Sequence, residues 1–139
     1  MFFRKLFFLT FVTSLILFRT LLNRQLWMNP LSDVMGGWGI WETVNAEQKL
    51  TTECIENVIM MVPFSSVAMW MFEEKIGNSL KKILWKSGKI AFYFSISIEM
   101  LQLLFRLGTF QLSDIFYNTV GGALGGLLYY VAMKARKRL

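Results

Sequence analysis

The sequence predicts an all-α protein, a multi-pass bundle of about four transmembrane helices. Of its 139 residues, 55% are hydrophobic and 16% are aromatic, and the mean hydropathy is +0.45. A soluble globular domain is usually less apolar than this. The apolar residues fall into four runs of about the length that crosses a bilayer as a helix. We therefore expect one membrane domain that covers residues 1–139.

The four runs predict the helices in chain order. Pro63 lies inside the second run and is expected to kink or break that helix, because proline lacks a backbone donor. The first run follows Arg4 and Lys5 as a signal peptide would, but its apolar length and the lack of a small-residue cleavage pattern favour a retained anchor. We expect helices at about 6–22, 57–73, 84–106 and 113–133, an interfacial loop over 23–56, and a short surface helix over 42–56 within that loop.

Basic residues predict the orientation, because cytoplasmic loops carry an excess of Lys and Arg. Three separate segments agree that both termini are cytoplasmic and that the loop 23–56 faces outside. The formal charge of +6 is spread over these flanking clusters, which does not favour a nucleic-acid partner. One side would carry Arg4, Lys5, Lys75, Lys81, Lys82, Lys86, Lys89, Lys134, Arg136, Lys137 and Arg138, and the other only Arg19, Arg24, Lys49 and Arg106.

Cysteine and histidine usage limits the kinds of site that the chain can build. Cys54 is the single cysteine and there is no histidine, so no disulfide can form within the chain. Carboxylates and carbonyls are then the remaining metal ligands, which argues against zinc and haem sites. We expect no metal and no cofactor.

Polar side chains interrupt the last two apolar runs. Ser95, Glu99, Gln102 and Arg106 follow one another at intervals of four, three and four, which places them on one face of a helix. On the next helix, Asp114 and Asn118 precede two overlapping GxxxG pairs, Gly121 with Gly125 and Gly122 with Gly126, a pattern that lets backbones approach closely.

The short turn between these helices predicts that they lie antiparallel. Arg106 should then lie near Asp114, Gln102 near Asn118, and Glu99 against the glycines. An ionisable side chain in a bilayer costs at least about 2.5 kcal/mol, and such residues usually mark function. A plain clamp of interhelical hydrogen bonds is the alternative, but five such groups exceed what a clamp needs. We expect the glycines to serve close packing inside the hairpin rather than a homodimer; the oligomeric state is left open.

The hairpin motif E-x-x-Q, a short loop and D-x-x-x-N-T-x-G-G, preceded by ENVIMMVPF, resembles the VanZ family of bacterial membrane proteins. The resemblance implies a multi-pass cell-membrane protein whose namesake lowers susceptibility to teicoplanin and related lipoglycopeptides, and it implies no catalytic chemistry. Ser65 stands where the family usually has a glycine after Pro-Phe. The resemblance spans about 56–130 and rests on Asn57, Pro63, Phe64, Glu99, Gln102, Asp114, Asn118, Gly121 and Gly122.

The leading functional hypothesis is an outward-facing polar pocket that binds an envelope lipid, a lipid-linked wall precursor or a lipoglycopeptide. Glu99 and Arg106 would complement its charges, Gln102, Asp114 and Asn118 would orient it, and Arg19 would contact an anionic headgroup.

The second hypothesis is a membrane enzyme that uses Glu99 or Asp114 as general acid or base on a lipid or prenyl-linked substrate. Ser95 and Ser113 are available as nucleophiles, but neither lies in a nucleophile motif. The third hypothesis is an accessory subunit that packs against a larger membrane complex through its glycine face.

Overall fold

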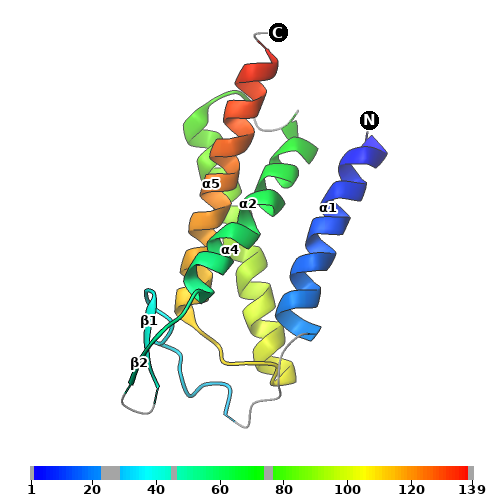
Figure 1. Cartoon of the computed structure of the whole chain (residues 1–139). Coiled ribbons are helices and arrows are strands. Elements are labelled where there is room, and N and C mark those ends of the chain that lie inside the picture. The colour runs from blue at the N-terminus through cyan, green and yellow to red at the C-terminus, as the bar shows by residue number, and fades with distance from the viewer. Residues whose placement is uncertain (1, 23–28, 45–46, 74–76, 138–139) are drawn as a thin grey trace.

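The computed structural model describes residues 2–22, 29–44, 47–73 and 77–137, and within these residues it places four α-helices side by side (Figure 1). The all-α prediction is confirmed. In the part of the chain that is described, three helical spans, Phe2–Leu22, Glu53–Met71 and Leu80–Phe105, are by length and composition able to cross a membrane. The helices are α1 Phe2–Leu17 with a following π-helical turn η1 Phe18–Leu22, α2 Glu53–Met71, α4 Leu80–Phe105 and α5 Leu112–Arg136.

Helix α5 is the centre of the bundle, since it packs along both α2 and α4. Helix α1 lies at the edge, mainly against α2 (Figure 1). Both chain termini lie at one end of the bundle, which we call the terminal end. The opposite end, the loop end, carries the strands and the turn between α4 and α5.

The segment expected to form a surface helix over 42–56 instead contains a two-stranded antiparallel ribbon. Strand β1 (Trp41–Val44) pairs with β2 (Glu47–Leu50), with Trp41 opposite Leu50. Aromatic and β-branched residues in β1 favour a strand over a helix. Helix α2 then begins at Glu53, four residues before the predicted start, and its first turn includes Glu53 and Glu56. Acidic residues stabilise the positive end of a helix dipole there.

Pro63 does not break α2, which runs as one helix from Glu53 to Met71. The proline is exposed on the outer face of the bundle. The Oγ of Ser66 lies 2.8 Å from the Val62 carbonyl oxygen and 2.9 Å from that of Gly125. Its hydroxyl therefore joins α2 to α5 close to the proline.

The glycines of α5 set how closely the helices pack. A Cβ on Gly121 would lie 2.3 Å from the Val58 carbonyl oxygen of α2, and one on Gly122 would lie 2.2 Å from the Ala91 Cβ of α4. Gly125 repeats the α2 contact and Gly126 the α4 contact one turn later. The two overlapping pairs therefore serve two different helices inside the chain.

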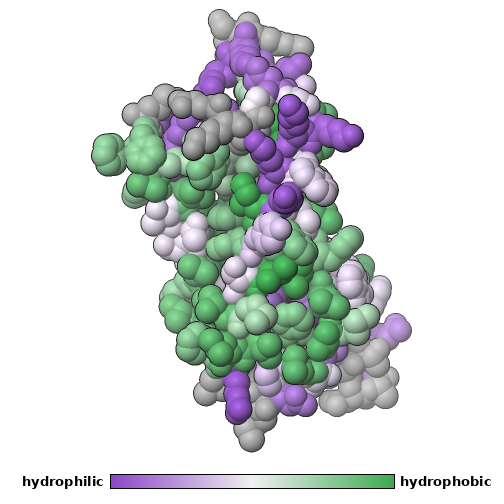
Figure 2. All heavy atoms as spheres, turned by 180° about the vertical axis from the view of Figure 1, so that it is seen from behind, coloured by the Kyte–Doolittle hydropathy of each residue, from purple (hydrophilic) through white to green (hydrophobic). Residues whose placement is uncertain are grey.

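Large apolar side chains fill the bundle and cover its outside. One buried cluster joins α1, α2 and α4 around Phe64, whose ring stacks on Phe94 with centroids 4.4 Å apart. Outside, hydrophilic residues gather at the terminal end and hydrophobic residues form a broad belt below them (Figure 2). A belt of this size would be costly in water and suits a lipid environment.

Candidate functional site

The polar stripe of α4 is buried, as its spacing predicted, except at its end. Ser95, Glu99 and Gln102 are at most 2% exposed. Arg106 is exposed because α4 ends at Phe105 and Arg106 adopts a left-handed cap with φ 55°. The helical spacing therefore no longer applies to its side chain. We call the buried or half-buried group Asn57, Ser95, Glu99, Gln102, Asp114 and Asn118 the polar cluster.

The sequence predicted that Glu99 lies against the glycines of α5. Its side chain instead reaches the turn between α4 and α5. Its Oε2 accepts a hydrogen bond of 3.1 Å from the backbone N–H of Gln111, the residue just before α5. Gln102 donates from Nε2 to the Thr20 carbonyl oxygen at 2.7 Å. That carbonyl belongs to η1, where the Thr20 hydroxyl donates back to Ile16 at 2.8 Å. Glu99 and Gln102 thus connect α4 to the turn before α5 and to η1 at the loop end.

The predicted pairs across the hairpin have other partners. Asn118 donates from Nδ2 to the Ser95 hydroxyl oxygen at 2.8 Å rather than bonding Gln102. Asp114 accepts from Asn57 Nδ2 at 2.7 Å, which joins α5 to the first half of α2. No ion pair of Arg106 with another described residue is present. The cluster therefore holds three helices together rather than two.

Two buried polar atoms have no hydrogen-bond partner among the described residues. They are Asn118 Oδ1 and Ser65 Oγ, on side chains that are 4% and 0% exposed. Buried polar groups are nearly always paired, and an exception needs an explanation such as a water or a ligand. Ser65, where the resemblance leads one to expect glycine, lies in a regular stretch of α2.

Arg19 pairs with Glu56, which is not a member of the polar cluster. Its guanidinium pairs with Glu56 Oε2, and Thr52 donates to Glu56 Oε1 at 2.7 Å. Both charged side chains are substantially exposed, 57% for Arg19 and 41% for Glu56. Arg24, the other basic residue predicted nearby, lies outside the described residues.

Residues 30–39, which we call the cover segment, lie over the loop end of the hairpin. Phe110 and Leu112 donate backbone N–H groups to the carbonyls of Pro30 and Val34, at 2.8 and 3.1 Å. These bonds tie the segment to the turn that carries Gln111. The cover segment therefore lies against the residues that lead into α5. The segment is also tied by side chains, with bonds of 2.7 to 3.0 Å from Ser113 Oγ to Gly36 O, from Gln111 Nε2 to Asp33 Oδ2 and from Gly39 N–H to Tyr117 Oη.

Gly37 offers a test of this docking. A Gly37→Ala variant should loosen the cover segment, because the new Cβ would lie 2.6 Å from Ser113 Oγ and 2.8 Å from Gln111 Oε1, at a φ of +74°. Gly39→Ala is the matched control, with a φ of +84° and no atom within 4 Å of the new Cβ. Both variants pay about 1–2 kcal/mol of left-handed strain, and Gly37→Ala additionally disturbs two hydrogen bonds worth about 1 kcal/mol each.

Hydrogen exchange of the amides in 30–39 measures the difference. We expect clearly faster exchange in Gly37→Ala than in Gly39→Ala. Equal exchange in the two variants would show that the cover segment is not held by Ser113 and Gln111.

The sequence did not reveal a second group of charges at the terminal end. Lys5 is only 8% exposed and donates to Glu73 Oε1 at 2.7 Å, while Arg136 Nη2 lies 3.4 Å from Glu73 Oε2. The Lys5 hydrogen bond holds the pKa of Glu73 below its usual value of 4.5, against the opposing effect of burial. Lys5 and Glu73 are 68 residues apart, so no local spacing signals their contact.

The cluster chemistry suits hydrogen bonding and charge complementarity better than nucleophilic catalysis. The Ser113 hydroxyl donates to the Gly36 carbonyl at 2.7 Å, so its proton points at a backbone group rather than at a base. The Ser95 hydroxyl accepts from the Asn118 amide. An activated nucleophile instead needs a base within hydrogen-bond reach of its proton.

Comparison with known proteins identifies the family. No solved structure matches the chain. Protein VanZ from Enterococcus faecium is 36% identical over 84 residues, which cover 59% of this chain and 47% of that protein, so the match spans about half of its length. The family described as VanZ/LLP1 matches residues 2–133. With a match over nearly its whole length, the chain belongs to the VanZ/LLP1 family.

Proposed function

We propose that the chain is a multi-pass protein of a bacterial cell membrane that lowers susceptibility to teicoplanin-type glycopeptides through its polar cluster. The observation that carries this proposal is the group of buried and half-buried acidic and amide side chains that three helices bring together at the loop end. Buried ionisable groups at membrane depth are costly and usually serve function. The family match and the similarity to Protein VanZ also support this proposal.

In the proposed orientation the loop end faces outside and the terminal end faces the cytoplasm. The charge distribution supports this, since cytoplasmic ends are rich in Lys and Arg. The loop end holds Arg19, Lys49 and Arg106 among the described residues, whereas the terminal end holds Arg4, Lys5, Lys81, Lys82, Lys86, Lys89, Lys134, Arg136 and Lys137.

The ligand would be an envelope lipid, a lipid-linked wall precursor or a lipoglycopeptide. Glu99 and Asp114 offer carboxylate acceptors to its donor groups, and Asn118 Oδ1 offers a buried carbonyl acceptor that lacks a partner among the described residues. In this proposal the cover segment moves aside when the ligand binds. Its exposed Leu31 and Met35, 56% and 70% exposed, would remain in contact with the lipid headgroup region.

Expression of the chain in a susceptible host tests the proposal. The minimum inhibitory concentration of teicoplanin should rise clearly over the empty vector. Glu99→Gln and Asp114→Asn should each remove the rise at an unchanged membrane level of protein. Glu47→Gln, which removes an exposed acid on β2, is the matched control and should keep the rise.

The outcomes separate a site from a clamp. Protection that persists in both Glu99→Gln and Asp114→Asn at normal protein levels contradicts the proposal. Loss of protection in step with loss of protein in the membrane shows instead that the cluster only holds the helices together.

The orientation has its own test. Cys54 is buried, 6% exposed, and is a poor reporter, so Gln48→Cys in a Cys54→Ser background places the thiol on the exposed strand β2. A membrane-impermeant thiol reagent should label it in intact cells. Labelling only after the membrane is opened would show that the loop end faces the cytoplasm, contrary to the proposed orientation.

A further inference from the structure

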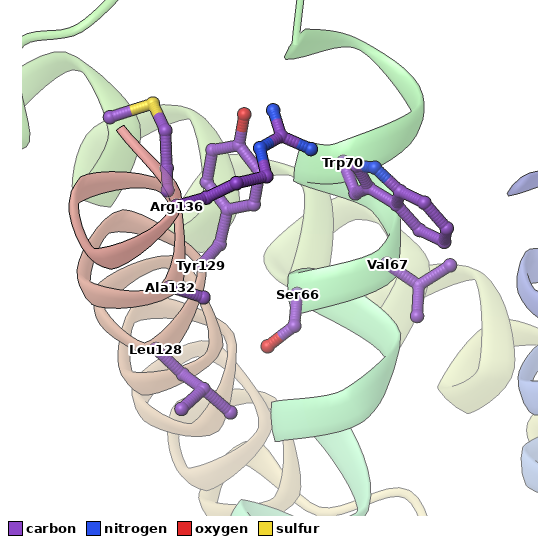
Figure 3. A pocket seen from close by; sticks show the side chains of 8 residues that line it. Ser66, Val67, Trp70, Leu128, Tyr129, Ala132 and Arg136 are labelled. Carbon is purple, nitrogen blue, oxygen red and sulfur yellow. The ribbon is translucent and has the colours of Figure 1, made fainter. Parts of the chain in front are cut away.

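A groove runs between α2 and α5 at the terminal end, away from the polar cluster. Its volume is about 340 Å³, within the range of ligand sites. Figure 3 shows Leu128 and Ala132 of α5 on one side and Val67 of α2 on the other, with Arg136, Tyr129 and Trp70 gathered at one end. The groove is thus lined by apolar side chains along most of its length. Its end at Arg136, Tyr129 and Trp70 is polar, and we call this end the mouth.

The apolar part of the groove is suited to bind a hydrocarbon chain. Ser66 supplies the polar side chain along this part of the groove, and its hydroxyl already lies 2.8 and 2.9 Å from the carbonyls of Val62 and Gly125. A satisfied hydroxyl offers little to a polar ligand. Leu128 is 53% exposed and would be covered by an acyl chain laid along the groove.

The mouth of the groove carries excess positive charge. Trp70 lies under two cations from α1, with Arg4 Cζ 5.4 Å and Lys5 Nζ 5.5 Å from its ring centroid. Arg136 closes the other side and remains 58% exposed. Glu73 is the acid that pairs with Lys5 and Arg136, and it is bound more closely to Lys5, at 2.7 Å, than to Arg136, at 3.4 Å.

Arg136 therefore retains donors that can bind an anion. A guanidinium has five N–H donors in a planar fork that matches phosphate geometry. A tryptophan beside it is typical of the level at which headgroups meet hydrocarbon. Basic pockets between transmembrane helices are a known form of anionic-lipid site.

We propose that this groove binds an anionic phospholipid of the leaflet at the terminal end, with one acyl chain between α2 and α5 and the headgroup phosphate on Arg136. The charge of the mouth selects an anionic lipid over a zwitterionic one. Such a site is separate from the polar cluster and would exist in either orientation of the chain.

Native mass spectrometry of the full chain, purified in detergent, tests the lipid site. Phosphatidylglycerol and phosphatidylcholine with identical acyl chains are the two probes. We expect at least about fivefold more retained phosphatidylglycerol, and about fivefold weaker retention in Arg136→Gln, because the headgroup phosphate loses the guanidinium that binds it. Lys137→Gln, which removes the same charge one residue further on, should stay within about twofold of the unaltered chain.

A filled groove gives the second arm. Ala132→Phe puts a ring into the apolar part of the groove from an exposed position and should reduce phosphatidylglycerol retention with all charges in place. Millimolar glycerol 3-phosphate should not displace the lipid.

Four results would overturn the lipid site. Equal retention of the two lipids is the first, and an equal loss in Arg136→Gln and Lys137→Gln, which would indicate diffuse surface charge, is the second. The third is full retention in Ala132→Phe and the fourth is displacement by glycerol 3-phosphate, since either would mean that no acyl chain occupies the groove.

Discussion

Replacing Glu73 with Gln is expected to lower the free energy of unfolding by about 3 kcal/mol. The change leaves the Lys5 ammonium, which is 8% exposed, without its carboxylate at 2.7 Å. Removing one partner of a buried ion pair costs about 3–5 kcal/mol because the other charge stays buried. Glu73 is 20% exposed, so the lower end of that range applies. Denaturant titration in mixed micelles measures the change.

Glu56→Gln is the matched control at the other end of the bundle. It removes the carboxylate that pairs with Arg19, but these side chains are 41% and 57% exposed. Exposed ion pairs are worth about 0–1 kcal/mol. A loss in Glu73→Gln no larger than that in Glu56→Gln would contradict the placement of Lys5 against α2.

The same pair predicts a pH dependence. Because Lys5 lowers the pKa of Glu73 in the folded chain, the stabilisation is fully present above the usual value of 4.5 and is lost as the pH falls through the lowered pKa. Glu73→Gln should remove this part of the pH profile. An unchanged acid limb of the profile in Glu73→Gln would show that other carboxylates are responsible.

Gly121→Ala is the second large effect, with an expected loss of up to about 3 kcal/mol. The new Cβ would lie 2.3 Å from the Val58 carbonyl oxygen and 2.9 Å from the Val58 Cα. These are backbone atoms of α2, so no side chain can rotate away, and overpacking in a tight contact costs about 1–3 kcal/mol. Denaturant titration in the same micelles gives the value.

Gly88→Ala makes the same substitution in α4 where there is room. Its Cβ would meet only the Thr119 Cγ2 at 4.0 Å, and alanine favours a helix over glycine by about 1 kcal/mol. We expect unchanged or raised stability. Equal behaviour of Gly121→Ala and Gly88→Ala would mean that α2 and α5 do not approach as closely as described.

The sequence predicted the helices and the buried stripe because both depend on local spacing. Ser95, Glu99 and Gln102 share a face at 3.6 residues per turn wherever the helix packs, and the structure buries all three. Arg106 was misplaced because the helix ends one residue before it. A left-handed cap at a non-glycine residue has no clear sequence signal.

The partners within the cluster could not be predicted in the same way. Glu99 bonds a backbone N–H and Gln102 bonds a carbonyl that belongs to a π turn. Backbone groups are present at every residue, so side-chain identity does not indicate which one is used. The cover segment is held mostly by bonds of this kind, with Phe110 and Leu112 as backbone donors. The ribbon at Trp41–Leu50 was missed because its apolar residues also fit a short amphipathic helix.

Binding of an envelope ligand by the purified chain tests the central claim most directly. Native mass spectrometry with teicoplanin, a lipid-linked wall precursor and an envelope phospholipid would be run on the unaltered chain, Glu99→Gln and Glu47→Gln, all three carrying Ala132→Phe so that the separate groove between α2 and α5 is filled. We predict that at least one ligand is retained by the unaltered chain and by Glu47→Gln and is lost in Glu99→Gln. Retention that is the same in Glu99→Gln, or no retention of any of the three ligands by the unaltered chain, would contradict a ligand site at the polar cluster.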